Sequence, residues 1–173
     1  MTARRQEKKV RHLRIVRLVA LAAPVLAASG LAVPDPVAWA AATERVVVNR
    51  HTGLAIDGVD PVAYFTDAEM TKGVPDIEMS VGEVVWRFRN DANRAVFQAH
   101  PDIYGPRYGG YDPVDVARGK AVAGRAQIWL VSGARLYLFS REDNRNAFAA
   151  DPQGILRQAD GAWPALTDAL SDY

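Results

Sequence analysis

The chain has 173 residues, with 21 Lys and Arg against 20 Asp and Glu, and it contains no cysteine. This length supports one globular domain, and an ordinary composition with 49% apolar residues argues against disorder and collagen-like repeats. The absence of cysteine excludes disulfides, Fe–S clusters, thiolate-bound metals and a cysteine nucleophile.

The N-terminal segment differs in composition from the rest of the chain. Its first 17 residues carry seven Lys and Arg against one acid, and 16 uncharged residues follow. A basic end, a short apolar stretch and the sequence Ala-Trp-Ala at positions 38–40 are typical of a secretory signal peptide. The pattern predicts a signal peptide over residues 1–42, cleaved after Ala40 or Ala42.

An uncleaved membrane anchor is the alternative interpretation of this segment. A membrane-spanning helix needs about 20 apolar residues, and the 16-residue stretch is shorter and contains Pro24, Ser29 and Gly30. Both interpretations place the remaining chain outside the cytoplasm, because the basic end stays inside. We therefore expect a periplasmic or secreted protein, or, if the segment stays uncleaved, an extracytoplasmic protein held at the membrane through this N-terminal segment alone.

Removing the N-terminal segment changes the charge of the protein. Residues 41–173 retain 14 Lys and Arg and 18 Asp and Glu, a net charge of −4 (14 − 18). Nucleic-acid-binding domains normally carry a basic patch or stripe, whereas the arginines here are scattered among acids. Nucleic acid is therefore not an expected partner.

The first elements of the remaining chain are short. Residues 46–48 and 54–56 are β-prone runs. Asp60 followed by Pro61 is typical of a helix N-cap with proline at the first helical position, which predicts a short helical turn after it. Residues 68–76 contain Lys-Gly and a proline, and they indicate a surface loop.

An internal repeat dominates the next part of the sequence. Residues 82–101 and 133–152 align at a constant offset of 51 with seven of 20 positions identical, and each copy reads as an aromatic strand followed by a helix that begins near Asn90 or Arg141. A strand before each copy, over residues 77–81 and 126–131, completes a hairpin. The repeat predicts an α+β fold, a small single domain with two repeated β-hairpin–helix units.

The spacer between the copies and the C-terminus have their own patterns. Residues 104–113 contain three tyrosines and three glycines, and Asp112 with Pro113 repeats the cap-and-proline pattern at the start of a short helix. The sequence of residues 164–170 predicts a C-terminal helix.

Several of these motifs together resemble the secreted bacterial YHS-domain proteins. The residues that carry the resemblance run from Ala55-Ile56-Asp57-Gly58-Val59-Asp60-Pro61-Val62-Ala63-Tyr64-Phe65 through Trp86-Arg87-Phe88, Asn93-Arg94, Phe97 and Pro101 to Tyr104 and Tyr108-Gly109-Gly110-Tyr111. The similarity covers roughly residues 50–170 and implies a YHS-like α+β domain over residues 43–173. It implies a small module of a kind often associated with metal handling and found beside copper-pump and oxygenase modules.

The chain departs from the metal-binding pattern of this family. The positions at which metal-binding YHS domains carry cysteine correspond to Ala63, Arg89 and Asn93, and the cysteine that often follows Tyr-Gly-Gly-Tyr in the secreted subfamily corresponds to Asp112. A site for Cu(I) or structural zinc is therefore not expected. The resemblance supports the fold more than a metal function.

Two sets of polar residues are candidates for metal binding or for catalysis. His51 with Asp57 and Asp60 offers a non-thiolate metal site, and the alternative is that the histidine is a surface residue and the aspartates belong to turns and caps. Asp60 and Asp112 offer a carboxylate pair for acid–base catalysis, for which helix capping is again the alternative. No serine-nucleophile motif, P-loop or dinucleotide fingerprint is present, so a nucleotide cofactor is not expected.

The tyrosine-rich spacer is the main candidate for ligand binding. Aromatic rings with hydroxyls can line a small-molecule pocket, and the alternative is a loop packed over the core. The candidate ligand-binding residues are Tyr64, Tyr104, Arg107, Tyr108, Tyr111 and Asp112. The sequence thus predicts an extracytoplasmic YHS-type binding module for a small ligand or a non-thiolate metal, without evident catalysis. The alternatives are a module that docks on an envelope protein through the same loop and, third, a carboxylate-based enzyme.

Overall fold

The computed structural model describes residues 46–81 and 84–171, all within one compact unit, Asp35–Tyr173. The elements are the short 3-10 turn η1 (Ile56–Gly58), α2 (Ala63–Thr66), β1 (Glu78–Val81), β2 (Val84–Arg87), α3 (Asp91–Ala99), α4 (Pro101–Tyr104), the 3-10 turn η2 (Arg107–Gly110), α5 (Pro113–Val116), β3 (Arg125–Ser132), β4 (Arg135–Phe139), α6 (Glu142–Ala150) and α7 (Pro152–Ser171).

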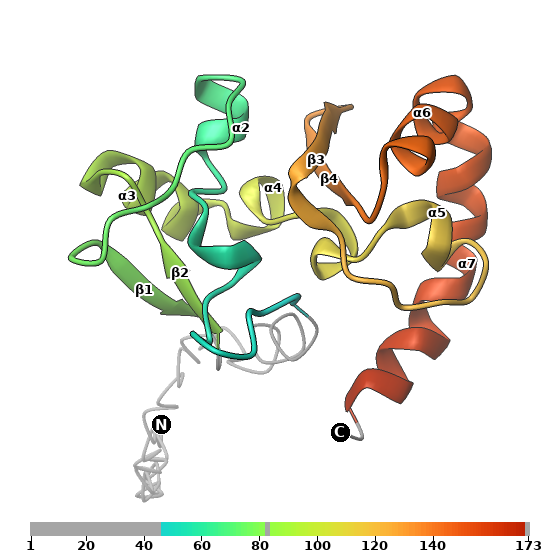
Figure 1. The fold of residues 1–173 in the computed structure, drawn as a ribbon, viewed down its shortest axis with the longest axis horizontal. Coiled ribbons are helices and arrows are strands. Elements are labelled where there is room, and N and C mark those ends of the chain that lie inside the picture. Colours follow the sequence, from blue (N-terminus) through green and yellow to red (C-terminus); the bar gives the residue numbers. More distant parts are fainter. Residues whose placement is uncertain (1–45, 82–83, 172–173) are drawn as a thin grey trace, which may run out of the picture. The chain divides into compact units, whose positions relative to one another are not determined.

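Two β-hairpin–helix units confirm the α+β fold predicted from the internal repeat (Figure 1). β1 pairs antiparallel with β2 and leads into α3, and β3 pairs antiparallel with β4 and leads into α6. The residues that precede the two helices are Asn90 and Arg141, where the sequence places the helix starts. Asn90 accepts a hydrogen bond from the backbone N–H of Asn93 over 2.7 Å, and so caps α3.

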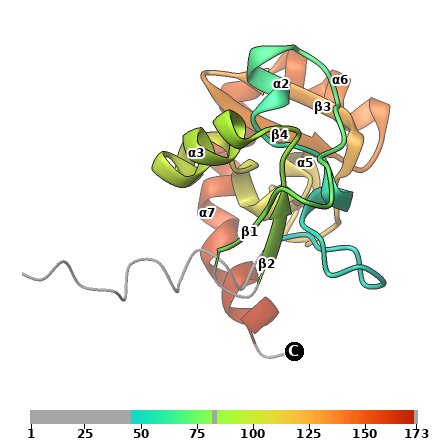
Figure 2. The same cartoon turned by 90° about the vertical axis from the view of Figure 1, so that its left-hand side faces the viewer.

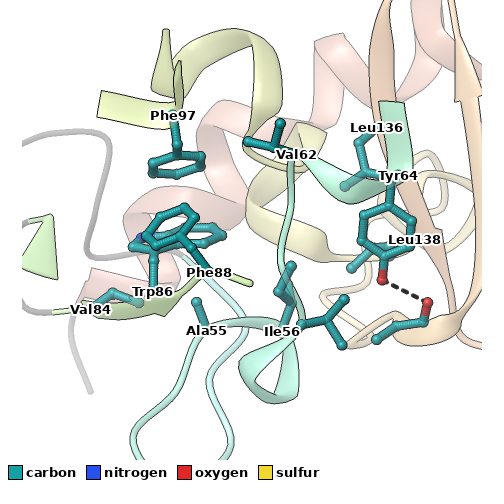
Figure 3. Close-up of a cluster of buried hydrophobic side chains, with 12 residues drawn as sticks. Ala55, Ile56, Val62, Tyr64, Val84, Trp86, Phe88, Phe97, Leu136 and Leu138 are labelled. Carbon is teal, nitrogen blue, oxygen red and sulfur yellow. Dashed lines mark hydrogen bonds between the residues drawn. The ribbon is translucent and has the colours of Figure 1, made fainter. Parts of the chain in front are cut away.

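Aromatic side chains of β2, of Phe88 directly after it and of α3 form the core of the first unit. Trp86 and Phe88 lie two residues apart, so they point to the same face, and both are buried. The ring centroid of Phe97 lies 4.7 Å from that of Trp86 and 5.3 Å from that of Phe88, and Figure 3 shows the three rings packed together. Leu136 and Leu138 of β4 belong to the same cluster, so the second hairpin contributes to the core of the first unit.

The second unit repeats this packing. The ring centroid of Phe148 on α6 lies 4.7 Å from that of Tyr137 and 5.5 Å from that of Phe139. The angles between the rings are 40° and 59°, against 39° and 55° for the corresponding pairs of the first unit. The identical phenylalanines of the sequence repeat therefore hold each helix on its hairpin in the same way.

The structural repeat extends further towards the N-terminus than the sequence repeat. η1 and η2 each contain three consecutive residues with left-handed backbone, and they align at an offset of 52 rather than 51. The φ angles are 42°, 58° and 69° at Ile56, Asp57 and Gly58, and 54°, 60° and 91° at Tyr108, Gly109 and Gly110. After each turn comes a buried aspartate, Asp60 or Asp112.

The C-terminal helix is longer than the sequence predicts. We expect a helix only over residues 164–170, whereas α7 begins at Pro152 and contains Pro164 in its interior. A proline at the first helical position lacks only an N–H that has no partner there, so Pro152 starts a helix as readily as it ends one. Asp151 accepts the N–H of Gly154 over 2.9 Å at this start. α7 then runs past α5, against which it packs (Figure 2).

The predicted signal peptide and its cleavage sites after Ala40 or Ala42 lie outside the described residues. Among residues 46–81 and 84–171, no helix is both long enough and apolar enough to cross a membrane.

Candidate functional site

Asp60 is a fully buried carboxylate between η1 and α2. Its Oδ1 accepts the backbone N–H of Val62 over 2.9 Å, and its Oδ2 accepts the backbone N–H of Arg89 over 2.9 Å and a side-chain N–H of Asn93 over 2.7 Å. The predicted N-cap role needs a correction, because α2 begins at Ala63 and has no side-chain cap. Asp60 instead connects the residues before α2 to the end of the first hairpin and to α3.

Asp112 is equally buried and has the corresponding partners in the second unit. Its Oδ1 accepts the N–H of Val114 over 2.9 Å, so it caps α5 as the sequence predicts. Its Oδ2 accepts the backbone N–H and the hydroxyl of Ser140 over 2.7 and 2.8 Å, and a side-chain N–H of Asn144 over 2.7 Å. Ser140 and Asn144 stand 51 residues after Arg89 and Asn93.

Asp60 and Asp112 are hydrogen-bonded to separate sets of partners, which gives no support to a catalytic pair. Each carboxylate is bound within its own unit, and both of its oxygens accept hydrogen bonds from protein donors. A general acid or base needs an oxygen within hydrogen-bond reach of a substrate. This geometry supports a structural role for both aspartates.

The second unit has an additional buried carboxylate, Asp115, where the first unit has Ala63. Its Oδ2 accepts a side-chain N–H of Asn144 over 2.9 Å and the hydroxyl of Ser140 over 3.1 Å. Its Oδ1 lies 3.4 Å from a guanidinium nitrogen of Arg118 and 3.6 Å from one of Arg141. Two carboxylates thus share the Asn144 amide, and two arginines balance the extra negative charge.

The tyrosine-rich spacer is packed against the rest of the protein. The ring of Tyr104 lies edge-on against Phe65, with centroids 5.1 Å apart. Tyr108 is buried, and its hydroxyl donates to Oδ1 of Asp160 in α7 over 2.7 Å. Tyr111 is partly buried with its ring 6.0 Å from that of Trp163. The aromatic side chains of the loop therefore face internal partners.

A polar cluster connects the loop to α7. It consists of Arg107, Tyr108 and Asp160. The Arg107 guanidinium donates to the same Asp160 oxygen over 2.7 Å, and its carbon lies 5.3 Å from the centre of the Tyr108 ring. Burial, followed by the Asp160 carboxylate, raises the pKa of the Tyr108 phenol. Partial burial acts to raise the pKa of Asp160, but hydrogen bonds from Tyr108 and Arg107 outweigh it and lower that pKa.

Sequence reasoning missed Asp160 as a partner of the loop. Trp163 is apolar and visible as part of a helical stripe, and its ring lies 5.5 Å from that of Tyr108. Asp160 stands one turn before Trp163, so the two residues lie on the same side of α7. This spacing is a signal for Asp160 only once α7 is known to begin well before residue 164.

Tyr64, predicted as a ligand-binding residue, lies in the hydrophobic core. It is 1% exposed, its hydroxyl donates to the backbone oxygen of Ala126 over 2.8 Å, and its ring lies 5.0 Å from that of Trp129. Figure 3 shows this hydrogen bond beside Leu136 and Leu138. Burial, with a smaller contribution from Asp57, raises the pKa of this phenol.

The residues of the candidate metal site do not converge. His51 is exposed, and its backbone N–H donates to the Asn49 side chain over 2.9 Å. The Asn49 amide donates in turn to Oδ1 of Asp57 over 2.9 Å, whereas Asp60 is buried among its own partners. In the part of the chain that the structure describes, no group of three or more His, Cys, Asp or Glu side chains is placed to hold a metal ion.

An open pocket of about 610 Å³ lies beside η1. We call it the Asp57 pocket. It combines apolar surface from Leu54 with the polar side chains of Asn49, Thr52, Asp57, Lys72 and Arg87. The Lys72 ammonium donates to the backbone oxygen of Asp57 over 2.5 Å. Two Arg87 nitrogens donate to one oxygen of Glu78 over 2.5 and 2.8 Å.

Comparisons with known proteins identify no relative: no family model, no curated protein and no solved structure matches this chain.

Proposed function

We propose that this protein is an extracytoplasmic YHS-type binding module that takes a small molecule in the Asp57 pocket and performs no catalysis. The observation that carries the proposal is the pocket itself. Its volume of about 610 Å³ falls in the range of roughly 300–1,000 Å³ usual for small-molecule sites, which combine apolar walls with a few polar groups.

The Tyr104–Asp112 loop is a weaker candidate for the ligand site. The Tyr108 hydroxyl and the Arg107 guanidinium are both engaged by Asp160, and Asp112 has no exposed surface. A ligand would have to displace these internal partners before it could use the same groups. For the same reason the loop offers little to an envelope protein. In the Asp57 pocket, Thr52, Asp57 and Lys72 are exposed and Asn49 is partly exposed, so a ligand can reach them, although the Asn49 amide and the Lys72 ammonium also donate to Asp57.

The proposal is tested by titrating the full chain with a fragment set of small carboxylic acids and amides while recording amide chemical shifts. We expect the shifts to move together at Gly58, Lys72 and Gly73, which line the pocket. Shifts that cluster instead at Tyr108 and Asp160 would show that the ligand binds at the tyrosine-rich spacer and not in the Asp57 pocket. MgCl₂ and ZnCl₂ serve as a separate arm, because shifts at His51 and Asp57 on addition of metal alone would favour a metal site.

A matched pair of variants separates the pocket from the rest of the surface. Thr52→Trp places a large ring at the pocket, and we expect it to abolish the fragment shifts. Thr66→Trp changes an exposed threonine that does not line the pocket, and it should leave them unchanged. Equal loss in both variants would contradict the assignment of the ligand to this pocket.

A further inference from the structure

The Asp57 pocket has a counterpart in the second unit. Gly58 in the pocket corresponds to Gly110, and the oxygens of these glycines accept the N–H groups of Gly73 and Gly124 over 3.0 and 2.9 Å. A Cβ atom built on Gly58 would meet Leu54 at 3.0 Å and Arg87 at 3.9 Å. A Cβ atom on Gly110 would meet the corresponding residues, Pro106 and Leu138, each at 3.5 Å. Two of the side chains nearest to each glycine therefore come from equivalent positions of the two units.

The counterpart in the second unit is filled by an extended piece of the chain. The side chain of Val47 lies over Gly110, with its Cβ 3.6 Å from the position of a Cβ on that glycine. The backbone N–H of Val47 donates to the oxygen of Gly109 over 2.8 Å, and its own oxygen accepts the N–H of Ile56 over 3.0 Å. The next residue, Val48, forms an antiparallel bridge with Ala55.

In the first unit the backbone oxygen equivalent to that of Gly109 is also a hydrogen-bond acceptor, but its donor is a side chain. Asp57 corresponds to Gly109, and its backbone oxygen accepts the Lys72 ammonium rather than a peptide N–H. The second unit has Ala123 at the position of Lys72, since Val59 bridges Lys72 and Tyr111 bridges Ala123. Lys72 is exposed, so its side chain can leave this oxygen at little cost.

We infer that the Asp57 pocket binds an extended segment of another polypeptide, with a β-branched apolar side chain over Gly58 and a backbone N–H donated to the Asp57 oxygen. The inference rests on the proposed use of this pocket as a binding site, and it replaces the small molecule by a polypeptide segment as the ligand. The segment takes the place that Val47 has in the second unit. The apolar side chain packs on Leu54 and on the aliphatic stem of Arg87, while Lys72 moves off the oxygen that it occupies in the free protein.

The probe is the peptide acetyl-Arg-Val-Val-Val-Asn-amide, which has the sequence of residues 45–49. It is titrated into the full chain while the amide shifts of Gly58 and Gly73 are followed. Glycine in place of the central valine should weaken binding about tenfold, because the isopropyl group loses its burial. A central N-methyl-valine should also weaken binding, since it lacks the N–H that Asp57 accepts.

Lys72→Ala distinguishes a peptide from a small anion. It makes the first unit resemble the second and frees the Asp57 oxygen, so peptide binding should tighten on the order of threefold. A small carboxylate held by the Lys72 ammonium would bind more weakly to the same variant. Thr52→Trp should block the peptide, and Thr66→Trp should not.

The outcomes separate this inference from the proposed function. If fragments shift the pocket amides and the peptide does not, the peptide class is wrong and the pocket remains a ligand site. If neither probe shifts them, both proposals fall. Equal affinities for the valine, glycine and N-methyl peptides would also overturn the inference. Dimerisation of the free protein that Thr52→Trp abolishes would assign the pocket to a second copy of this chain instead.

Discussion

Asn93 and Asn144 each donate a side-chain N–H over 2.7 Å to a fully buried aspartate, Asn93 to Asp60 and Asn144 to Asp112. A buried carboxylate is stable only when its oxygens are hydrogen-bonded. In both units the asparagine comes from the helix after the hairpin, and the aspartate comes from the turn before it. The pair therefore joins the beginning and the end of each unit across the hairpin.

Replacing either aspartate should destabilise the protein strongly. Asp60→Ala removes the acceptor for two backbone N–H groups and the Asn93 amide, and Asp112→Ala removes the acceptor for the corresponding donors. We expect each change to lower the free energy of unfolding by about 3 kcal/mol, because buried donors lose their partners. Urea denaturation measures the loss, and Glu69→Ala at an exposed acid is the control, expected within about 0.5 kcal/mol of wild type. A loss below about 1 kcal/mol for Asp60→Ala would show that water satisfies these donors.

The repeated units can be predicted from the sequence because they depend on local patterns. Trp86 and Phe88 in the first hairpin, like Tyr137 and Phe139 in the second, lie two residues apart, and Phe97 and Phe148 follow them at the same distance. These positions determine both the face of the strand and the site where the helix packs. The positions of the first residues of α3 and α6 follow from the polar residues at their starts.

The candidate site depends on pairings that local patterns do not contain. Asp60 and Asn93 are hydrogen-bonded although they lie 33 residues apart in the sequence, and Tyr108 and Asp160 although they lie 52 apart. Capping explains an aspartate before proline without any such partner, so the sequence gives no reason to look for one. The Asp57 pocket is harder still to predict, because Val47 lies over the glycine turn of one unit, and among the residues that the structure describes none is recorded in the equivalent place on the other.

Gly124 is a position where the fold requires glycine. A Cβ atom there would lie 2.6 Å from the Cβ of Leu138 and 2.7 Å from the backbone oxygen of Gly110. Gly124→Ala should therefore displace the backbone at residue 124 from β4 and η2 and lower the free energy of unfolding by about 2 kcal/mol. Gly161→Ala provides the control, because nothing lies near that glycine and alanine favours the interior of α7, so this change should stabilise by about 0.5–1 kcal/mol. Thermal unfolding of both variants measures the difference, and equal melting temperatures would contradict the close contact.

The Arg107–Asp160 ion pair should make a small, pH-dependent contribution to stability. Because Tyr108 and Arg107 lower the pKa of Asp160 in the folded state, the unfolded chain takes up a proton at this group first as the pH falls. The stabilisation is therefore complete above about pH 4, the ordinary range of an aspartate, and disappears as the pH falls through the lower folded pKa. The Asp160 side chain is 50% exposed, so solvent screening limits the coupling to about 0.5 kcal/mol. A double-mutant cycle of Arg107→Gln and Asp160→Asn, measured by urea denaturation at pH 7 and pH 2, should give this coupling energy at pH 7 and a smaller one at pH 2. A coupling energy that is the same at both pH values would show that the interaction does not depend on the charge of Asp160.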